Sequence, residues 1–459
     1  MKKLKNKDLT RGPIMSQLIR MAAPIMATSF IQMAYTLTDT AWVGRLGSKE
    51  VAAIGSIGLI LWFVQTISRL TKIGAEVNIS QSIGLKNDER ARLYAGHCTT
   101  LSMTFSTIIG ILLFTLAPFI VQIFKLEADV AHLAVIYLRV LSTSLPFWFL
   151  ANTMTGIYNA TGHTKVPFQI SAFGLILNMI LDPILIFGLD LGLYGAAFGT
   201  WIAQVSVLCV FMVRLKKDHL LDHFPLFVRF KRIYVAHILK IGAPVSAFSM
   251  LFSVVNIYLM RLASQTGGHI AITCLGTGSQ IEAITWNTTQ GFSTALNAFI
   301  GQNYVAHYYK RVVKALKSVM RLGIIFGTLT SLLFILFGEE IFSIFIPEKE
   351  AYIEGGKYLF ILGFSQFFMS LEIIMQGVFF GLGKSTPPAV NSIVFNYIRI
   401  PLAILLVSLG MGTLGIWWSI SISTMIKGLA IFFWFLIIQK RILNTEGFKR
   451  LGPNKHTSK

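Results

Sequence analysis

The chain has 459 residues, of which 54% are hydrophobic and only 13% are charged, and 40 Lys and Arg residues face 20 Asp and Glu residues. Soluble domains carry about a quarter of charged residues, so this composition excludes a soluble globular protein as well as a disordered or collagen-like chain. It is typical of an all-α polytopic membrane protein. We assign the basic excess to cytoplasmic loops and expect no nucleic-acid partner.

Apolar windows of about 20 residues predict twelve transmembrane helices. The first six cover approximately 18–43, 51–83, 93–123, 130–154, 167–188 and 193–213, and the second six cover 237–262, 271–300, 313–337, 352–380, 388–409 and 414–438. The second and eighth windows are polar along one side, which indicates that they line a hydrated space. The predicted organisation is a cytoplasmic segment 1–17, an N-lobe 18–213, a linker 214–236, a C-lobe 237–438 and a cytoplasmic tail 439–459.

The distribution of basic residues predicts how the chain crosses the membrane. One set of connections carries only five Lys and Arg residues, namely Arg45, Lys49, Lys125, Arg261 and Lys349. The alternate connections and both ends of the chain carry far more, and cytoplasmic loops are the ones enriched in Lys and Arg. We therefore expect a multi-pass protein of the cell (inner or plasma) membrane with both termini in the cytoplasm, which agrees with an even number of spans.

The sequence repeats itself at an offset of about 220 residues. The segment Arg20–Pro24 (RMAAP) recurs as Lys240–Pro244 (KIGAP), and Gly156–Pro167 (GIYNATGHTKVP) recurs as Gly377–Pro388 (GVFFGLGKSTPP). A repeated six-helix unit keeps its orientation, so the pseudo-twofold axis runs along the membrane normal. The repeat predicts two pseudo-symmetric six-helix lobes around a central cleft, the architecture of a carrier that alternates access.

Polar residues inside the N-lobe spans are the main candidates for a functional site, because charges in lipid are costly. Asp39 lies near the outer end of the first span, Asp182 follows Asn178 by one turn in the fifth, and Thr200 begins the sixth. At 1.5 Å per residue, all four lie within about 15 Å of the outer boundary. Their oxygens suit either a proton or Na⁺; the alternative is that they are solvated residues at helix ends. Pro24 predicts a bend in the first span.

Other polar residues inside the spans are weaker candidates. They are Gln32, Tyr35, Glu282, Glu372 and Arg399. Each either faces the cleft and contacts substrate or only pairs with other side chains of its own lobe. No enzyme signature emerges, because GLGKST at 381–386 lacks the glycine spacing of a phosphate-binding loop and follows no strand. We expect a protein that is not an enzyme, holds no cofactor and draws its energy from an ion gradient.

Four segments resemble the multidrug and toxic compound extrusion (MATE) family: 22–55, GIYNATGHTKVP at 156–167, NMILDPILIFGLDLGLYGAAFGT at 178–200 and GLGKSTPP at 381–388. The similarity extends over 18–438. It implies a twelve-helix antiporter, which we expect to be a monomer, that expels cationic or amphipathic drugs in exchange for H⁺ or Na⁺.

The resemblance is nearest to the DinF-like branch of that family. It implies that Asp39, Asn178, Asp182 and Thr200 carry the coupling ion and that Pro24 bends the first helix. One departure is Phe252, which stands where other branches have a glutamate, so we expect coupling in the N-lobe. The alternatives are a flippase for lipid-linked saccharide or cell-wall precursors and a membrane-embedded enzyme.

Overall fold

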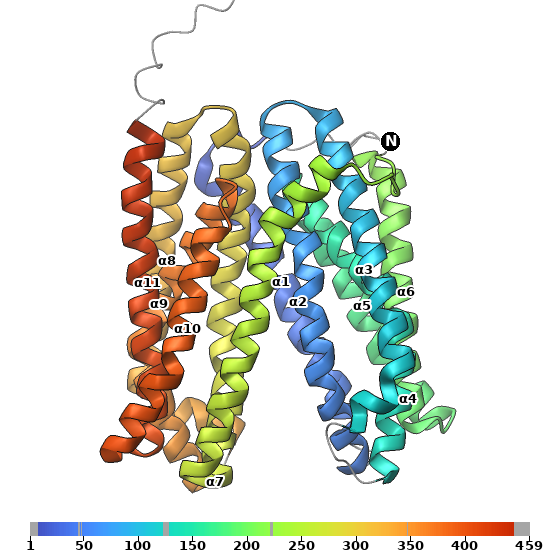
Figure 1. The fold of residues 1–459 in the computed structure, drawn as a ribbon, viewed down its shortest axis with the longest axis vertical. Helices are drawn as coiled ribbons and strands as arrows, with labels where there is room; N and C mark the ends of the chain where they lie inside the picture. The colour runs from blue at the N-terminus through green and yellow to red at the C-terminus, as the bar shows by residue number, and fades with distance from the viewer. Residues whose placement is uncertain are drawn as a thin grey trace, which may run out of the picture. The chain divides into compact units, whose positions relative to one another are not determined.

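The computed structural model describes residues 8–44, 46, 48–122, 128–220, 224–346 and 348–444, which form helices joined by short turns (Figure 1). The elements of the first half are α1 (Ile14–Gly44), α2 (Ser48–Gly84), α3 (Asp88–Gln122), α4 (Ala128–Ala160), α5 (Lys165–Pro183), the π-helix η1 (Ile184–Gly188) and α6 (Gly192–Asp218). Those of the second half are α7 (Arg232–Val305), α8 (Tyr309–Phe345), α9 (Lys349–Gly381), α10 (Thr386–Leu406), the π-helix η3 (Val407–Met411) and α11 (Thr413–Asn444).

The twelve predicted helices are confirmed. The 74-residue element α7 is two helices that meet at Gly268, whose φ of 62° and ψ of −148° are not helical. Among the described residues, ten of the helices are long and apolar enough to cross a membrane. The second part of α7 is not one of them, and it is one of the two spans that the sequence marks as polar along one side.

Several helices extend beyond the apolar windows from which they were predicted. The fourth window ends at residue 154 whereas α4 continues to Ala160, and the sixth ends at residue 213 whereas α6 continues to Asp218. Hydropathy detects only the part of a helix that lies in lipid, because the polar turns at its ends are satisfied by water and by neighbouring helices.

The chain divides into two compact units. Unit 1 contains Arg20–Ser246, and unit 2 contains Leu9–Ile19 together with the chain from Ala247 onwards. The first turns of α7 therefore belong to unit 1, where Ile238 is fully buried in a cluster with Leu70 and Phe211. In unit 2 the segment Leu9–Ile19 is held through its backbone. Residues 237–246, at the start of the predicted C-lobe, thus belong to unit 1, whereas Leu9–Ile19 belongs to unit 2.

The backbone geometry of unit 1 recurs in unit 2. The turn after α4 contains Gly162 (φ 82°), and the His163 amide donates to the Tyr158 carbonyl at 2.9 Å. The turn after α9 contains Gly383 (φ 74°) in the same way, and the Lys384 amide donates to the Phe379 carbonyl at 2.8 Å. The left-handed residues Lys86 and His307 mark a second equivalent turn, and the π-helices η1 and η3 a third. This repetition is what the duplicated sequence predicts.

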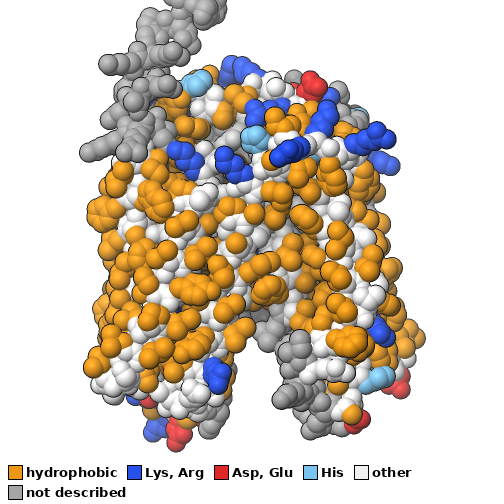
Figure 2. Space-filling model, viewed as in Figure 1, with side chains coloured by type: hydrophobic (Ala, Val, Ile, Leu, Met, Phe, Trp, Pro, Cys, Tyr) orange, Lys and Arg blue, Asp and Glu red, His pale blue; other side chains and the backbone are white. Residues whose placement is uncertain are grey.

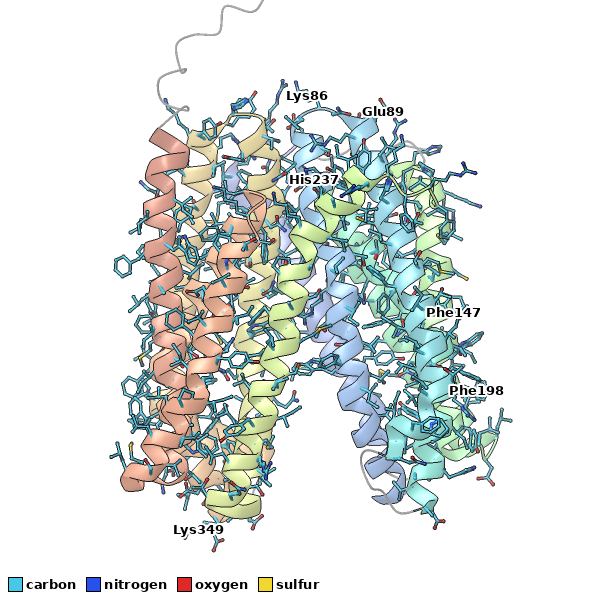
Figure 3. All side chains as sticks on the ribbon, viewed as in Figure 1. Lys86, Glu89, Phe147, Phe198, His237 and Lys349 are labelled. Carbon is cyan, nitrogen blue, oxygen red and sulfur yellow. The ribbon has the colours of Figure 1, made fainter. Side chains whose placement is uncertain are left out.

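Helix surfaces in both units are apolar, as a lipid environment requires. Hydrophobic side chains cover the sides of the helices in Figure 2, and exposed examples include Ile111 at 59% and Phe433 at 58%. In unit 1, Phe198 is 45% exposed and points away from the helices (Figure 3). In the same unit, Lys86 and Glu89 lie at the end of the helices where α2 turns into α3 (Figure 3).

Candidate functional site

A buried carboxylate and amide form the centre of the candidate site in unit 1. Asn178 and Asp182 are both 0% exposed, and the Asn178 side-chain nitrogen donates to Oδ1 of Asp182 at 2.8 Å. The two residues are one turn apart on α5, so the helix itself places them on one face. Asp182 stands directly before Pro183, which ends α5 and is followed by η1. Such π-helical turns often occur at functional sites.

Helix α6 approaches this pair closely through a glycine. A Cβ atom on Gly199 would lie 2.3 Å from Oδ1 of Asp182, so the backbone of α6 comes as near to the carboxylate as glycine permits. The next residue, Thr200, has a buried hydroxyl that makes no hydrogen bond within the described part of the chain, and the same holds for Oδ1 of Asn178. Buried oxygens without partners are costly, so this layer has acceptor capacity to offer a proton or a cation.

The remaining predicted N-lobe residues lie on α1. Asp39 is helical in its backbone, but its side chain lies outside the described residues. Gln32 is exposed, whereas Tyr35 is half-buried and its hydroxyl is buried. Helix α1 runs without a break through Pro24, and the Thr28 hydroxyl donates to the Pro24 carbonyl at 2.8 Å. The structure therefore joins two of the four predicted ion-site residues, Asn178 and Asp182, places Thr200 directly after the glycine that approaches them, and leaves Asp39 undetermined.

In unit 2 the charged residues mostly satisfy one another. Glu372, 2% exposed, forms an ion pair with Lys427 at 2.9 Å and accepts hydrogen bonds from Ser392 at 2.8 Å and from Gln376 at 2.9 Å. The pair and its hydrogen bonds join α9, α10 and α11, and loss of one partner would leave an uncompensated buried charge. From the sequence, Lys427 was considered as a pairing partner for the buried acids of this lobe, which the ion pair with Glu372 agrees with, but Ser392 was missed. Gln376, one turn later on the same helix, carries a local signal.

Arg399 and Glu282 complete the charged cluster of unit 2 without forming an ion pair with each other. Arg399 is 6% exposed and donates from Nε to the Ser423 hydroxyl at 2.8 Å and from Nη2 to the Thr424 hydroxyl at 2.9 Å. Its guanidinium also stacks over the ring of Phe252 at 5.7 Å. Phe252 therefore supports a cation at the position where the resemblance led us to look for an acid.

The described part of the chain contains no cluster of three or more His, Cys, Asp or Glu side chains that could coordinate a cation. A cation beside Asp182 would depend on one carboxylate with the neutral oxygens of Asn178 and Thr200, and on any contribution from Asp39. Such a donor set suits a proton or a weakly held monovalent ion better than a divalent metal, which needs more carboxylate charge.

A family model decides the identity of the chain. The MatE model matches residues 24–184 and again residues 244–405, once in each half of the duplicated sequence. The chain belongs to the MatE family. Members of this family are membrane transporters and not enzymes, so the protein is a MATE-family transporter in which Asn178 and Asp182 lie within the first matched segment and Thr200 follows it.

Relatives and solved structures agree with this assignment. The probable multidrug resistance protein NorM of Thermotoga maritima is 26% identical over 96% of both chains. The multidrug export protein MepA of Staphylococcus aureus is 22% identical over 94% of this MATE transporter and 96% of its own length. A crystal structure of MATE in the straight conformation has a TM-score of 0.90 at 22% identity and covers 97% of this chain and 100% of that one, which shows that the fold is shared.

Proposed function

We propose that this MATE transporter exports cationic or amphipathic small molecules across the cell membrane in exchange for H⁺ or Na⁺, by alternating access. Family membership and the names of the relatives support this proposal. NorM and MepA are named for multidrug resistance and export, and a relative in Shewanella oneidensis, 24% identical over 93% of this chain and 95% of its own length, is named an FAD transporter. None of these names favours the flippase alternative.

The coupling site of the proposed antiport is built around Asp182. The observation that carries it is a carboxylate at 0% exposure in a membrane helix, bonded to a neutral amide and approached by glycine on the neighbouring helix. Such a group is costly to keep charged without a cation, so it favours binding one. Asn178, Thr200 and Asp39 complete the site, and loading and unloading it changes the charge that α5 and α6 bury.

The other predicted residues take supporting roles in this proposal. Pro24 removes one backbone hydrogen bond from α1 and lets that helix bend as the site changes its charge. Gln32, Tyr35, Glu282 and Arg399 contact substrate, and Glu372 holds Lys427 in place. The protein acts as a monomer with both termini in the cytoplasm.

Asp182→Asn tests the coupling site directly. We expect this variant to lose ethidium export while it still inserts and folds, because an amide keeps the size of the carboxylate but binds neither a proton nor Na⁺ as well. The matched control is Asp190→Asn, since Asp190 is exposed in the turn before α6 and its φ of 54° suits asparagine. Efflux from cells that express each variant at equal level is the measurement.

The outcome of this experiment is decisive in both directions. Full export by Asp182→Asn removes that residue from coupling, and equal loss in Asp190→Asn shows a folding defect instead. Export by the wild-type protein is then measured with the pH gradient collapsed, with and without a sodium gradient, which separates H⁺ from Na⁺ as the coupling ion.

A further inference from the structure

Unit 1 contains a second buried acid that the proposed coupling site does not use. Glu76, in α2, is 5% exposed, and its Oε1 accepts a hydrogen bond from the Asn159 side chain of α4 at 3.0 Å. Lys72, one turn earlier on α2, interacts electrostatically with Glu76. Among the described residues, however, Glu76 forms no ion pair. A buried carboxylate with one neutral donor is costly to keep ionised, so this group is suited to binding a proton.

A row of polar groups lies along the contact between α2 and α4 and ends at Thr71 and Thr153, between one and two turns before Glu76 and Asn159 on their helices. Asn152 donates to the Ser68 hydroxyl at 3.4 Å, the hydroxyls of Thr71 and Thr153 are 3.0 Å apart, and Thr153 donates in turn to Ser102 at 3.0 Å. Ser68 and Glu76 lie about 12 Å apart along α2. Hydroxyl groups both donate and accept, so such a row can pass a proton.

Glu76 and Asn159 lie near the predicted cytoplasmic end of unit 1. Asn159 is the last residue but one of α4, and α2 ends two turns beyond Glu76 at Gly84. Asp182, in contrast, lies near the opposite end of α5, which begins at Lys165 and ends at Pro183. Glu76 and Asp182 are therefore placed toward opposite sides of the membrane.

Most of these polar residues are not repeated in the duplicated unit, where only Ser68 has a hydroxyl counterpart, Thr289, which lies 3.4 Å from the Ser370 hydroxyl. The equivalent turns at Lys86 and His307 and at Gly162 and Gly383 align α2 with the second part of α7 and α4 with α9. The same spacing places apolar or amide side chains opposite the others: Phe292 for Thr71, Asn297 for Glu76, Ile373 for Asn152, Ile374 for Thr153 and Phe380 for Asn159. The same scaffold thus exists once with a buried acid at this position and once with an amide.

We propose that Glu76 is the proton-release group of unit 1, which receives the coupling proton from Asp182 and passes it to the cytoplasm. This inference rests on the proposed antiport and takes H⁺ as the coupling ion. The O–H bond of protonated Asp182 breaks, water and the hydroxyl row carry the proton, and an O–H bond forms on Glu76. Glu76 then gives the same proton to cytoplasmic water, so one proton moves and no other bond changes.

Glu76→Gln is the test, because glutamine keeps an oxygen that accepts the Asn159 hydrogen bond but cannot bind a proton. In reconstituted vesicles with an internal pH dye, we expect ethidium-coupled proton flux at least about tenfold slower than in the wild type. Added formate should restore much of the lost flux, since a small weak acid can carry the proton instead. Glu89→Gln, an exposed acid of the same unit, should be unchanged.

A second variant guards against misfolding of the first. Thr153→Val keeps the shape of the side chain but interrupts the row, and we expect the same slow, formate-sensitive flux. Wild-type flux in Glu76→Gln, or a slow flux that formate does not restore in either variant, overturns the inference. Wild-type export that moves no protons contradicts H⁺ as the coupling ion, whereas a defect confined to the row leaves the proposed antiport intact.

Discussion

At the scale of single residues, the candidate site depends on how closely α6 approaches Asp182. The hydrogen bond from Asn178 fixes one carboxylate oxygen, and Gly199 leaves no room for a side chain beside it. The carboxylate is therefore held between two helices. A change in its charge is felt by both of them, which is the property that a coupling residue needs.

Gly199→Ala tests this close approach. The added methyl group would lie 2.3 Å from Oδ1 of Asp182 and must displace the carboxylate or the helix. We expect lost export and a stability loss of about 1–3 kcal/mol, typical of overpacking. Gly188→Ala is the matched control, since the nearest atom to its methyl group would be 3.9 Å away. Export and thermal unfolding of both variants are the measurements, and normal export by Gly199→Ala would contradict the proposed tight site.

The buried pair in unit 2 makes a different prediction at the same scale. Glu372→Gln leaves the Lys427 ammonium, 6% exposed, without its anion. We expect a stability loss of about 3–5 kcal/mol, of which a second substitution, Lys427→Met, restores a large part because no unpaired charge remains. Thermal unfolding of the single and double variants measures this. Export lost at unchanged stability would instead assign Glu372 to transport.

At the scale of elements, α1 is a continuous helix that lacks one backbone hydrogen bond, at Pro24. Proline cannot donate to the carbonyl one turn earlier, yet α1 extends from Ile14 to Gly44 through Pro24. A helix with one bond missing is easier to bend at that point. The proposed bend of α1 during transport therefore has a defined location in the element that also carries Asp39.

Pro24→Ala tests whether that weak point is used. Alanine supplies the missing donor, so we expect a more stable protein with slower ethidium export. Thermal unfolding and efflux are measured together, and Ala23→Ser, an exposed neighbour on the same helix, is the control. Unchanged export with higher stability would show that the proline is a static feature of α1.

At the scale of the whole molecule, two units repeat one backbone plan but bury different polar groups. The turns, the π-helices and the close glycine contacts recur: a Cβ on Gly156 would lie 2.6 Å from the Lys72 carbonyl oxygen, and one on Gly377 would lie 2.3 Å from that of Ser293. The buried acids do not recur. Two units with the same backbone geometry but different buried side chains are what gene duplication followed by specialisation produces.

The proposed orientation is also a prediction at this scale. With Cys98, Cys209 and Cys274 replaced by serine, we expect Lys86→Cys to react with an impermeant thiol reagent only from the cytoplasm, and Asp190→Cys only from outside. Both positions are exposed in turns at opposite ends of the helices of unit 1. Labelling of intact cells and of inverted vesicles measures this, and the reverse pattern would place the termini outside.

The sequence by itself determined the features that are local along the chain. Twelve helices follow from apolar windows, the duplication from recurring turn residues, and the Asn178–Asp182 bond from two residues one turn apart on a helix. Each of these depends on the geometry of a single helix or turn. The sequence is therefore sufficient to predict them, apart from helix ends that lie outside lipid.

Only the tertiary structure decided which distant residues meet. The approach of Gly199 to Asp182, the bond between Asn159 and Glu76, and the Glu372–Lys427 pair all join separate helices. Arg69, Lys72 and Glu76 follow one another at helical spacing along the chain, whereas the hydrogen-bond donor to Glu76 lies on α4. Composition and periodicity state which face of a helix is polar, but the partner of that face is set by how the helices pack, and packing depends on the shapes of many side chains at once.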